Sequence, residues 1–145
     1  MPEPTLELTE SPSAADLTAL TDGLTAHSLE ATGAPAHKPL AVFARDVDGR
    51  VVGGAQGRLN WNWVDVSLLW VDEPLRGRGL GARLLAALED AARARGCRAS
   101  HLETFTFQAR AFYEKQGYEV FAVLEDYGPG CERIYLRKAL QDAAS

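Results

Sequence analysis

The fold is decided by one stretch of the chain, Trp63-Val-Asp-Val-Ser-Leu-Leu-Trp-Val-Asp-Glu-Pro-Leu-Arg-Gly-Arg-Gly-Leu-Gly-Ala-Arg83. It begins with a hydrophobic run long enough for a strand, which ends at Val71, and continues through a polar turn that contains Pro74. Three glycines then alternate with other residues at the start of an Ala/Leu/Arg-rich segment: Gly77, Gly79 and Gly81. Alternating glycines at the beginning of a helix let successive backbone N–H groups converge, and the unpaired N–H groups and dipole of the first turn act in the same direction. The stretch therefore predicts an anion-binding cradle between a strand and a helix, suited to phosphate or pyrophosphate.

Composition and charge limit the class of partner. The chain has 145 residues, of which 46% are hydrophobic, and a net charge of −5. This predicts a single domain over residues 1–145 with its own core, and the acidic balance argues against a nucleic-acid partner. Between Arg76 and Arg98, however, six arginines face only two acidic residues, a balance that suits a small polyanion such as a nucleotide-bearing cofactor. A general use of arginine in place of lysine would produce the same excess.

The termini and cysteines bear on location. The acidic N-terminus lacks the apolar segment of a signal peptide, and no apolar run approaches the roughly 20 residues of a membrane span. Cys97 and Cys131 match no zinc or redox spacing. We therefore expect a cytoplasmic protein with free thiols, no metal and no membrane partner, and we leave open whether it is a monomer or a homodimer.

Hydrophobic periodicity predicts a mixed order of elements. About seven strands are expected, at 5–9, 40–45, 50–59, 63–71, 99–107, 118–124 and 133–138. Three helices are expected, at 12–31, 80–95 and 108–116. Ser11 would cap the first helix with Pro12 in its first position, and residues 125–132 would form a long Gly/Pro loop. The strand at 99–107 would run parallel to the strand ending at Val71, through a right-handed crossover.

The strand at 63–71 contains a slip in its alternation. Val64, Val66 and Leu68 share one face, whereas Leu69 and Val71 have the opposite parity. A one-residue insertion of this kind predicts a β-bulge, which would leave backbone groups unpaired just before the cradle. A strand buried on both faces would show the same residues.

The glycines alone are compatible with two cofactors. Gly77 to Ala82 also satisfies the dinucleotide fingerprint in its alanine-ended form, with Glu103 as a candidate ribose-binding acid. In a dinucleotide fold, however, the first glycine directly follows the first strand, whereas here residues 72–76 intervene and antiparallel strands come before. A nucleotide-hydrolase loop is excluded because no Gly-Lys-Ser/Thr follows.

Two motifs resemble the GNAT superfamily of N-acetyltransferases. The segment Val71 to Gly81 resembles its acetyl-CoA signature, Gln/Arg-x-x-Gly-x-Gly/Ala after a Val-x-Pro turn, with Arg76, Gly79 and Gly81 at the fixed positions. The segment Ala109-Arg-Ala-Phe-Tyr-Glu-Lys-Gln-Gly-Tyr118 resembles the family's Ala-x-x-Phe-Tyr-Glu-Lys-x-Gly-Phe. The order of predicted elements matches the GNAT topology from residue 6 to residue 136.

The resemblance implies an α+β fold whose mixed, mostly antiparallel sheet of about seven strands is flanked by helices and splayed at an acetyl-CoA cleft. It implies acetyl transfer to a primary amine of a small molecule or peptide, by direct attack in a ternary complex and without a metal. The pyrophosphate would lie on the loop and the pantetheine arm along the bulged strand. Thr106 would stand where family members often have asparagine. These cofactor-binding residues are Leu69, Trp70, Val71, Arg76, Gly77, Arg78, Gly79, Leu80, Gly81, Ala82 and Thr106. A non-catalytic acetyl-CoA-binding or interaction module with the same fold is the alternative.

The catalytic candidates are one phenol and two carboxylates. The resemblance supports Tyr113 as the acid that protonates the departing thiolate, with Phe112 facing the core and turning Tyr113 toward the groove edge; a packing tyrosine is the alternative. Glu103 and Asp65 lie on strands beside the predicted cleft and are candidate bases, as is a chain of waters.

Overall fold

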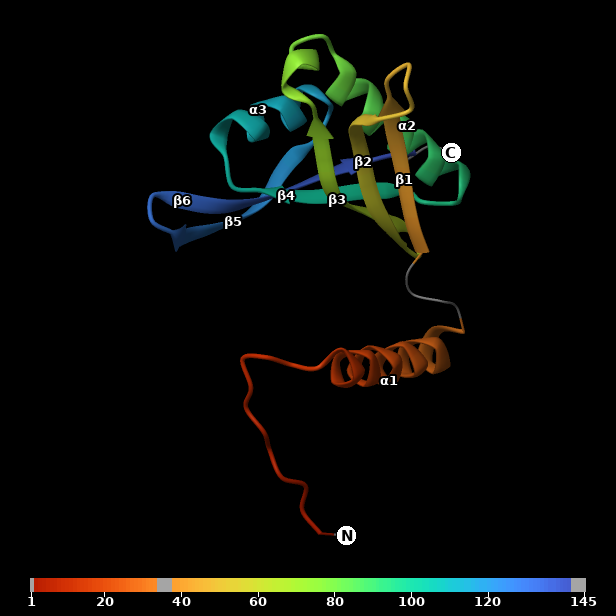
Figure 1. Ribbon diagram of the computed structural model, residues 1–145, viewed down its shortest axis with the longest axis vertical. Coiled ribbons are helices and arrows are strands. Elements are labelled where there is room, and N and C mark those ends of the chain that lie inside the picture. The colour runs from red at the N-terminus through yellow and green to blue at the C-terminus, as the bar shows by residue number, and fades with distance from the viewer. Residues whose placement is uncertain (1, 34–37, 142–145) are drawn as a thin grey trace. The chain divides into compact units, whose positions relative to one another are not determined.

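The structure is a computed structural model that describes residues 2–33 and 38–141 (Figure 1). The chain divides into two compact units, residues 1–36 and 37–145. Each unit is described here by itself. None of the helices within the described residues is both long and apolar enough to cross a membrane.

The first unit contains one helix, α1 (Ala14–Thr32). Its N-cap is Ser13, whose hydroxyl accepts the N–H of Asp16 at 3.1 Å, so the predicted cap at Ser11 is wrong. The helix ends at Thr32, one residue beyond the predicted end at 31, and its C-cap Gly33 is left-handed (φ 73°) and donates its N–H to the carbonyl of Leu29 at 2.7 Å. A helix that ends on a left-handed glycine satisfies one of its last carbonyls in this way.

The predicted strand at 5–9 is wrong, because residues 2–9 contain no strand. A strand needs the backbone groups of a neighbour, and no described strand pairs with this segment. Instead, the Thr9 hydroxyl accepts the N–H of Ser11 at 3.0 Å, a local bond that competes with sheet pairing. Two alternating leucines were too short a pattern to identify a strand.

The second unit is built on a six-stranded sheet in the order β1-β2-β3-β4-β6-β5. The strands are β1 (Lys38–Arg45), β2 (Val51–Asn60), β3 (Trp63–Val71), β4 (Ala99–Thr104), β5 (Glu119–Gly128) and β6 (Cys131–Ala139). Only β3 and β4 are parallel, so the predicted α+β class and the mixed, mostly antiparallel sheet are confirmed. The short helix η1 (Glu73–Leu75) and α2 (Leu80–Ala94) form the crossover between them, and α3 (Phe107–Lys115) follows β4.

The predicted bulge is present in β3. Gln56 pairs with Leu68 and Gly57 pairs with Val66, so Ser67 is an extra residue opposite β2. Before it, Val64 and Val66 are buried; after it, Leu69 and Val71 are partly buried against the same core. The alternative of a strand buried on both faces is wrong, because Leu68 and Trp70 are exposed.

The predicted splay is also present. β3 and β4 pair only at Trp63–Ala99, Val64–Ser100 and Asp65–His101, after which they separate (Figure 1). The rest of β3 has no described strand on its β4 side, so its backbone groups form no strand-to-strand hydrogen bonds there.

The core lies between the sheet and α2. Leu84, Leu85 and Leu88 of α2 are buried against Val66 and Leu102 of the sheet. Their spacing of one, three and four residues gives the apolar stripe that the sequence predicted. The helix ends at Ala94, one residue before the predicted end at 95, and beyond its cap the chain turns through the left-handed Gly96 (φ 95°).

Two boundaries in the C-terminal half differ from prediction. The loop expected at 125–132 is wrong, because β5 continues to Gly128 and β6 begins at Cys131. The strand accommodates its polar segment through a register shift after Leu124, with Asp126 left-handed (φ 52°). The strand expected at 99–107 stops at Thr104, since Thr106 caps α3.

Candidate active site

The loop between β3 and α2 is held by its own hydrogen bonds. Asp72 caps η1, because its Oδ1 accepts the N–H of Glu73 at 3.0 Å and its carbonyl accepts the N–H of Leu75 at 2.9 Å. The guanidinium of Arg76 turns back on the strand, where Nε donates to the carbonyl of Val71 at 2.9 Å. The charge of Arg76 is therefore anchored beside the end of β3.

The glycines of this loop leave the start of α2 uncovered. Gly77 and Gly79 are left-handed (φ 79° and 80°), and apart from their chain neighbours no atom of the described residues lies within 4 Å of where a Cβ would stand at either position. Gly79 is the N-cap and has no side chain to cap the helix, whose first turn closes when Arg83 donates its N–H to Gly79 at 3.1 Å. Within the described residues, the N–H groups of Leu80–Ala82 have no acceptor. The helix dipole and these donors together favour an anion here.

A cavity of about 360 Å³ lies in front of these donors. It is lined by seven of the predicted cofactor-binding residues, Val71, Arg76, Gly77, Gly79, Leu80, Gly81 and Ala82. Leu75, Phe112 and Gln116 complete it and were missed by the sequence analysis. The ring of Phe112 lies 3.6 Å from where a Cβ of Gly81 would stand. A glycine inside a helix can mark such a close approach, so Gly81 is the sequence feature that could have indicated that α3 packs here.

The other four predicted cofactor-binding residues do not line this cavity. Arg78 is exposed, and Leu69 is partly buried against the core. Trp70 faces the opposite side of the sheet from Val71 and is 48% exposed. Thr106 is the N-cap of α3, where its hydroxyl accepts the N–H of Ala109 at 3.2 Å. Thr106 thus has a structural role in starting the helix that carries Tyr113.

Tyr113 packs edge-on between two other rings. Its ring centroid lies 5.1 Å from that of Phe112 and 5.8 Å from that of Tyr118. The expected division, with Phe112 toward the core and Tyr113 toward the groove, is not seen: both rings pack partly against the core and Phe112 also lines the cavity. The Tyr113 hydroxyl makes no hydrogen bond within the described residues. Because every fully buried polar side-chain atom there has a hydrogen-bond partner, this hydroxyl is not fully buried and is accessible to solvent. Burial of the ring raises the pKa of Tyr113, so the phenol stays protonated at neutral pH.

Behind Tyr113 lies a buried polar network that the sequence did not suggest. The Tyr118 hydroxyl donates to Oε2 of Glu89 at 2.7 Å and lies 2.7 Å from the Ser100 hydroxyl. Lys138 donates to Oε1 of Glu89 at 2.8 Å, which neutralises a carboxylate only 4% exposed. Burial raises the pKa of Tyr118 strongly. The network joins α2, β4 and β6 through Tyr118, whose ring packs edge-on against that of Tyr113.

Comparison with known proteins identifies the family. The model of the acetyltransferase (GNAT) family matches residues 8–118. The chain is an acetyltransferase of the GNAT family. Members of this family use acetyl-CoA.

Relatives agree with this assignment. The chain is 44% identical to a blasticidin-S acetyltransferase of Streptomyces morookaense over 71% of its own length and 79% of that protein. It is 33% identical to the acetyltransferase Atu2258 of Agrobacterium fabrum, over 83% and 88% of the two chains. A crystal structure from Agrobacterium tumefaciens, assigned as an acetyltransferase, superposes with a TM-score of 0.88 at 31% identity and covers 93% of this chain and 98% of that one.

The two candidate bases of this GNAT acetyltransferase have different surroundings. Both carboxylate oxygens of Glu103 are bound by Arg133, with Nε at 2.8 Å from Oε2 and Nη2 on Oε1. Arg133 in turn lies over three aromatic rings, 5.5 Å from the centroid of Phe105, 5.1 Å from that of Tyr127 and 5.5 Å from that of Tyr135. A carboxylate whose two oxygens both accept from a guanidinium must give up one of these hydrogen bonds before it can accept from a substrate amine.

Asp65 lies where β3 and β4 separate. It is part of the last parallel pair, with His101, and its Oδ1 is 4.0 Å from Nδ1 of that histidine. His101 also contacts the ring of Trp63 edge-on, with centroids 5.6 Å apart. Within the described residues neither oxygen of Asp65 is paired with a lysine or arginine, in contrast to those of Glu103.

Proposed function

We propose that this GNAT enzyme transfers an acetyl group from acetyl-CoA to a primary amine of a small molecule or peptide by direct attack in a ternary complex. The uncapped first turn of α2 carries the proposal, because its free N–H groups open into the cavity formed by the glycine loop. A small acceptor is favoured by the relative that is named as a blasticidin-S acetyltransferase.

The donor would be held at two places. The N–H groups of residues 77–82 would bind the pyrophosphate, and the empty space over Gly77 and Gly79 fits a close approach of phosphate to backbone. The open side of β3 at Leu69–Val71 would bind the pantetheine arm, with a backbone N–H donated to the thioester carbonyl oxygen. Acetyl-CoA supplies the activated thioester; the loop and strand orient it.

Proton transfers are assigned to Tyr113 and Asp65. The Tyr113 hydroxyl is accessible and carries its proton at neutral pH, so it is available to protonate the departing thiolate. The pairing of Glu103 with Arg133 favours Asp65, or water ordered by it, as the group that takes the proton of the attacking amine. No covalent enzyme intermediate is needed.

The test is release of free CoA thiol in the presence of acetyl-CoA and a panel of primary amines. We expect thiol release that depends on both the enzyme and the amine, and calorimetric binding of acetyl-CoA by the enzyme alone. Arg76→Ala should weaken acetyl-CoA binding mostly at low salt, as for an exposed charge, and Arg58→Ala, on β2, is the matched control. Binding of acetyl-CoA without thiol release for any amine would overturn the proposed reaction and leave the cofactor site.

A further inference from the structure

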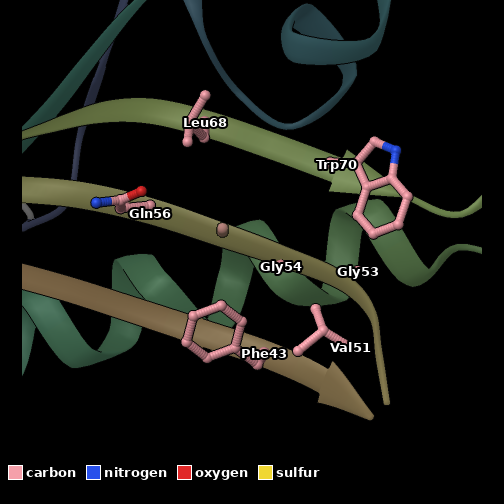
Figure 2. A pocket seen from close by; sticks show the side chains of 8 residues that line it. Phe43, Val51, Gly53, Gly54, Gln56, Leu68 and Trp70 are labelled. Atoms are coloured by element: carbon pink, nitrogen blue, oxygen red, sulfur yellow. The ribbon is translucent and has the colours of Figure 1, made fainter. Parts of the chain in front are cut away.

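A second, apolar pocket lies on the face of the sheet opposite α2 (Figure 2). It has a volume of about 150 Å³. Phe43 of β1 and Leu68 and Trp70 of β3 stand on the two sides of β2 and form its walls. Gly53 and Gly54 form its floor, and Gln56 is its one polar side chain.

The space exists because β2 carries glycine at its centre. A Cβ at Gly54 would lie 3.0 Å from the carbonyl oxygen of Val42 and 3.2 Å from Cδ1 of Phe43, so any side chain there would press into the pocket wall. The three wall residues have large exposed fractions for apolar side chains of their size: 57% for Phe43, 62% for Leu68 and 48% for Trp70. Clustered exposure of this kind marks a binding surface.

The bulge connects this pocket to the cofactor cavity. Because Ser67 is an extra residue, Trp70 points to the pocket while the next residue, Val71, lines the cavity in front of α2. The two sites therefore share the end of β3 on opposite faces of the sheet. A molecule seated in the pocket lies next to the segment of strand assigned to the thioester.

We propose that the pocket binds an apolar six-membered ring of the amine acceptor, an inference that rests on the proposed acetyl transfer. A cavity of about 150 Å³ with an apolar lining is the size that holds a benzene molecule. The rings of Phe43 and Trp70 offer it aromatic edges and faces. Among the described residues, those that line the pocket include no charged side chain, so the amine and any charged group of the acceptor stay outside it.

The kinetic test compares phenethylamine, which carries the ring, with propylamine, which lacks it. We expect kcat/KM to favour phenethylamine by roughly tenfold or more, as for apolar groups that fill a pocket. Gly54→Ala fills the floor of the pocket and Phe43→Ala removes a wall. Each variant should lose most of the preference for phenethylamine, while its kcat/KM for propylamine stays within about twofold of the wild-type value. Phe121→Ala, at another largely exposed phenylalanine, on β5, is the matched control and should change kcat/KM for neither amine.

A second measurement does not depend on activity. Fluorobenzene, observed by fluorine NMR, should bind the wild-type protein and Phe121→Ala, and lose binding in Gly54→Ala and Phe43→Ala. Equal kcat/KM for the two amines, or fluorobenzene binding that both pocket variants retain, would overturn the ring site while acetylation of propylamine still stands. Absence of thiol release with either amine, with fluorobenzene binding lost in the pocket variants, would reject the proposed reaction and support the ring site.

Discussion

Tyr113 and Tyr118 are neighbours whose hydroxyl groups have opposite surroundings, and this contrast allows a sharp test of the catalytic assignment. The Tyr113 hydroxyl has no hydrogen bond within the described residues, so Tyr113→Phe should change the free energy of unfolding by no more than about 0.5 kcal/mol. If this hydroxyl is the general acid, its removal should lower turnover by roughly a hundredfold to ten-thousandfold, which is about 3 to 5 kcal/mol of activation free energy.

Tyr118→Phe is the matched control. It removes the donor at 2.7 Å from Glu89 and the partner at 2.7 Å from Ser100, both of which are buried. A bond to a buried carboxylate contributes more than a neutral one, so we expect the free energy of unfolding to fall by about 2 to 4 kcal/mol. Turnover per folded molecule should remain close to that of the wild type.

Urea unfolding and initial rates of thiol release, both at 25 °C, measure the two effects separately. Wild-type turnover in Tyr113→Phe would refute the role of acid and leave Tyr113 as a packing residue. If turnover and acetyl-CoA affinity fell together, the hydroxyl would instead hold the pantetheine arm. A loss of turnover in Tyr118→Phe equal to that in Tyr113→Phe would show that the ring position, and not the hydroxyl, is what matters.

Three further predictions concern the loop and the buried network. Gly79→Val should abolish the binding of acetyl-CoA, as measured by calorimetry. Gly49→Val is the control, because Gly49 lies at a turn with the same left-handed backbone (φ 84°); it should carry a similar strain of about 1 to 2 kcal/mol and still bind acetyl-CoA. Equal acetyl-CoA affinity in the two variants would place the cradle elsewhere. Lys138→Met should lower the free energy of unfolding by about 2 to 4 kcal/mol, because it leaves the buried carboxylate of Glu89 without a cation. Adding Glu89→Leu should restore part of this loss. A double variant that is no more stable than Lys138→Met alone would contradict the prediction. Because burial raises the pKa of Tyr118 in the folded state, only the unfolded chain loses the phenol proton just above pH ~10. The free energy of unfolding should therefore be unaffected by this group below that pH and fall above it. Urea unfolding measured as a function of pH should show a shallower decline for Tyr118→Phe than for the wild type.

Local patterns predicted much of the fold and of the cofactor loop. The glycines at 77–81 determine backbone geometry directly, and a change of parity at Leu69 has a single structural meaning once one face is buried. The N-terminal strand at 5–9 failed because strand formation depends on a partner, which lies outside the segment itself. The loop at 125–132 failed because a left-handed Asp126 lets a polar strand continue.

The side-chain partners of the site were less predictable. Glu103 is paired with Arg133, thirty residues away, and Glu89 with Lys138 across forty-nine. Nothing in either local sequence indicates which charge lies opposite, because sheet order decides it: β6 lies beside β4 only through the fold. The sequence therefore predicted Glu103 as a candidate base, but it did not predict the ion pair with Arg133 that occupies its carboxylate.

The extra residue in β3 also reverses which positions of this strand tolerate substitution. Before Ser67 the even-numbered residue Val66 is buried and should accept only apolar side chains of similar volume. After it the odd-numbered Leu69 and Val71 take that place, and even-numbered Trp70 lies on the outer surface, where a substitution leaves the core unchanged. A library that randomises alternate positions along the strand would therefore change the core in one half and the outer surface in the other. Deleting Ser67 would make Val66 and Leu68 consecutive partners of Gly57 and Gln56, so the strand would lose its bulge while Leu69 and Val71 kept facing the core and Trp70 the outer surface.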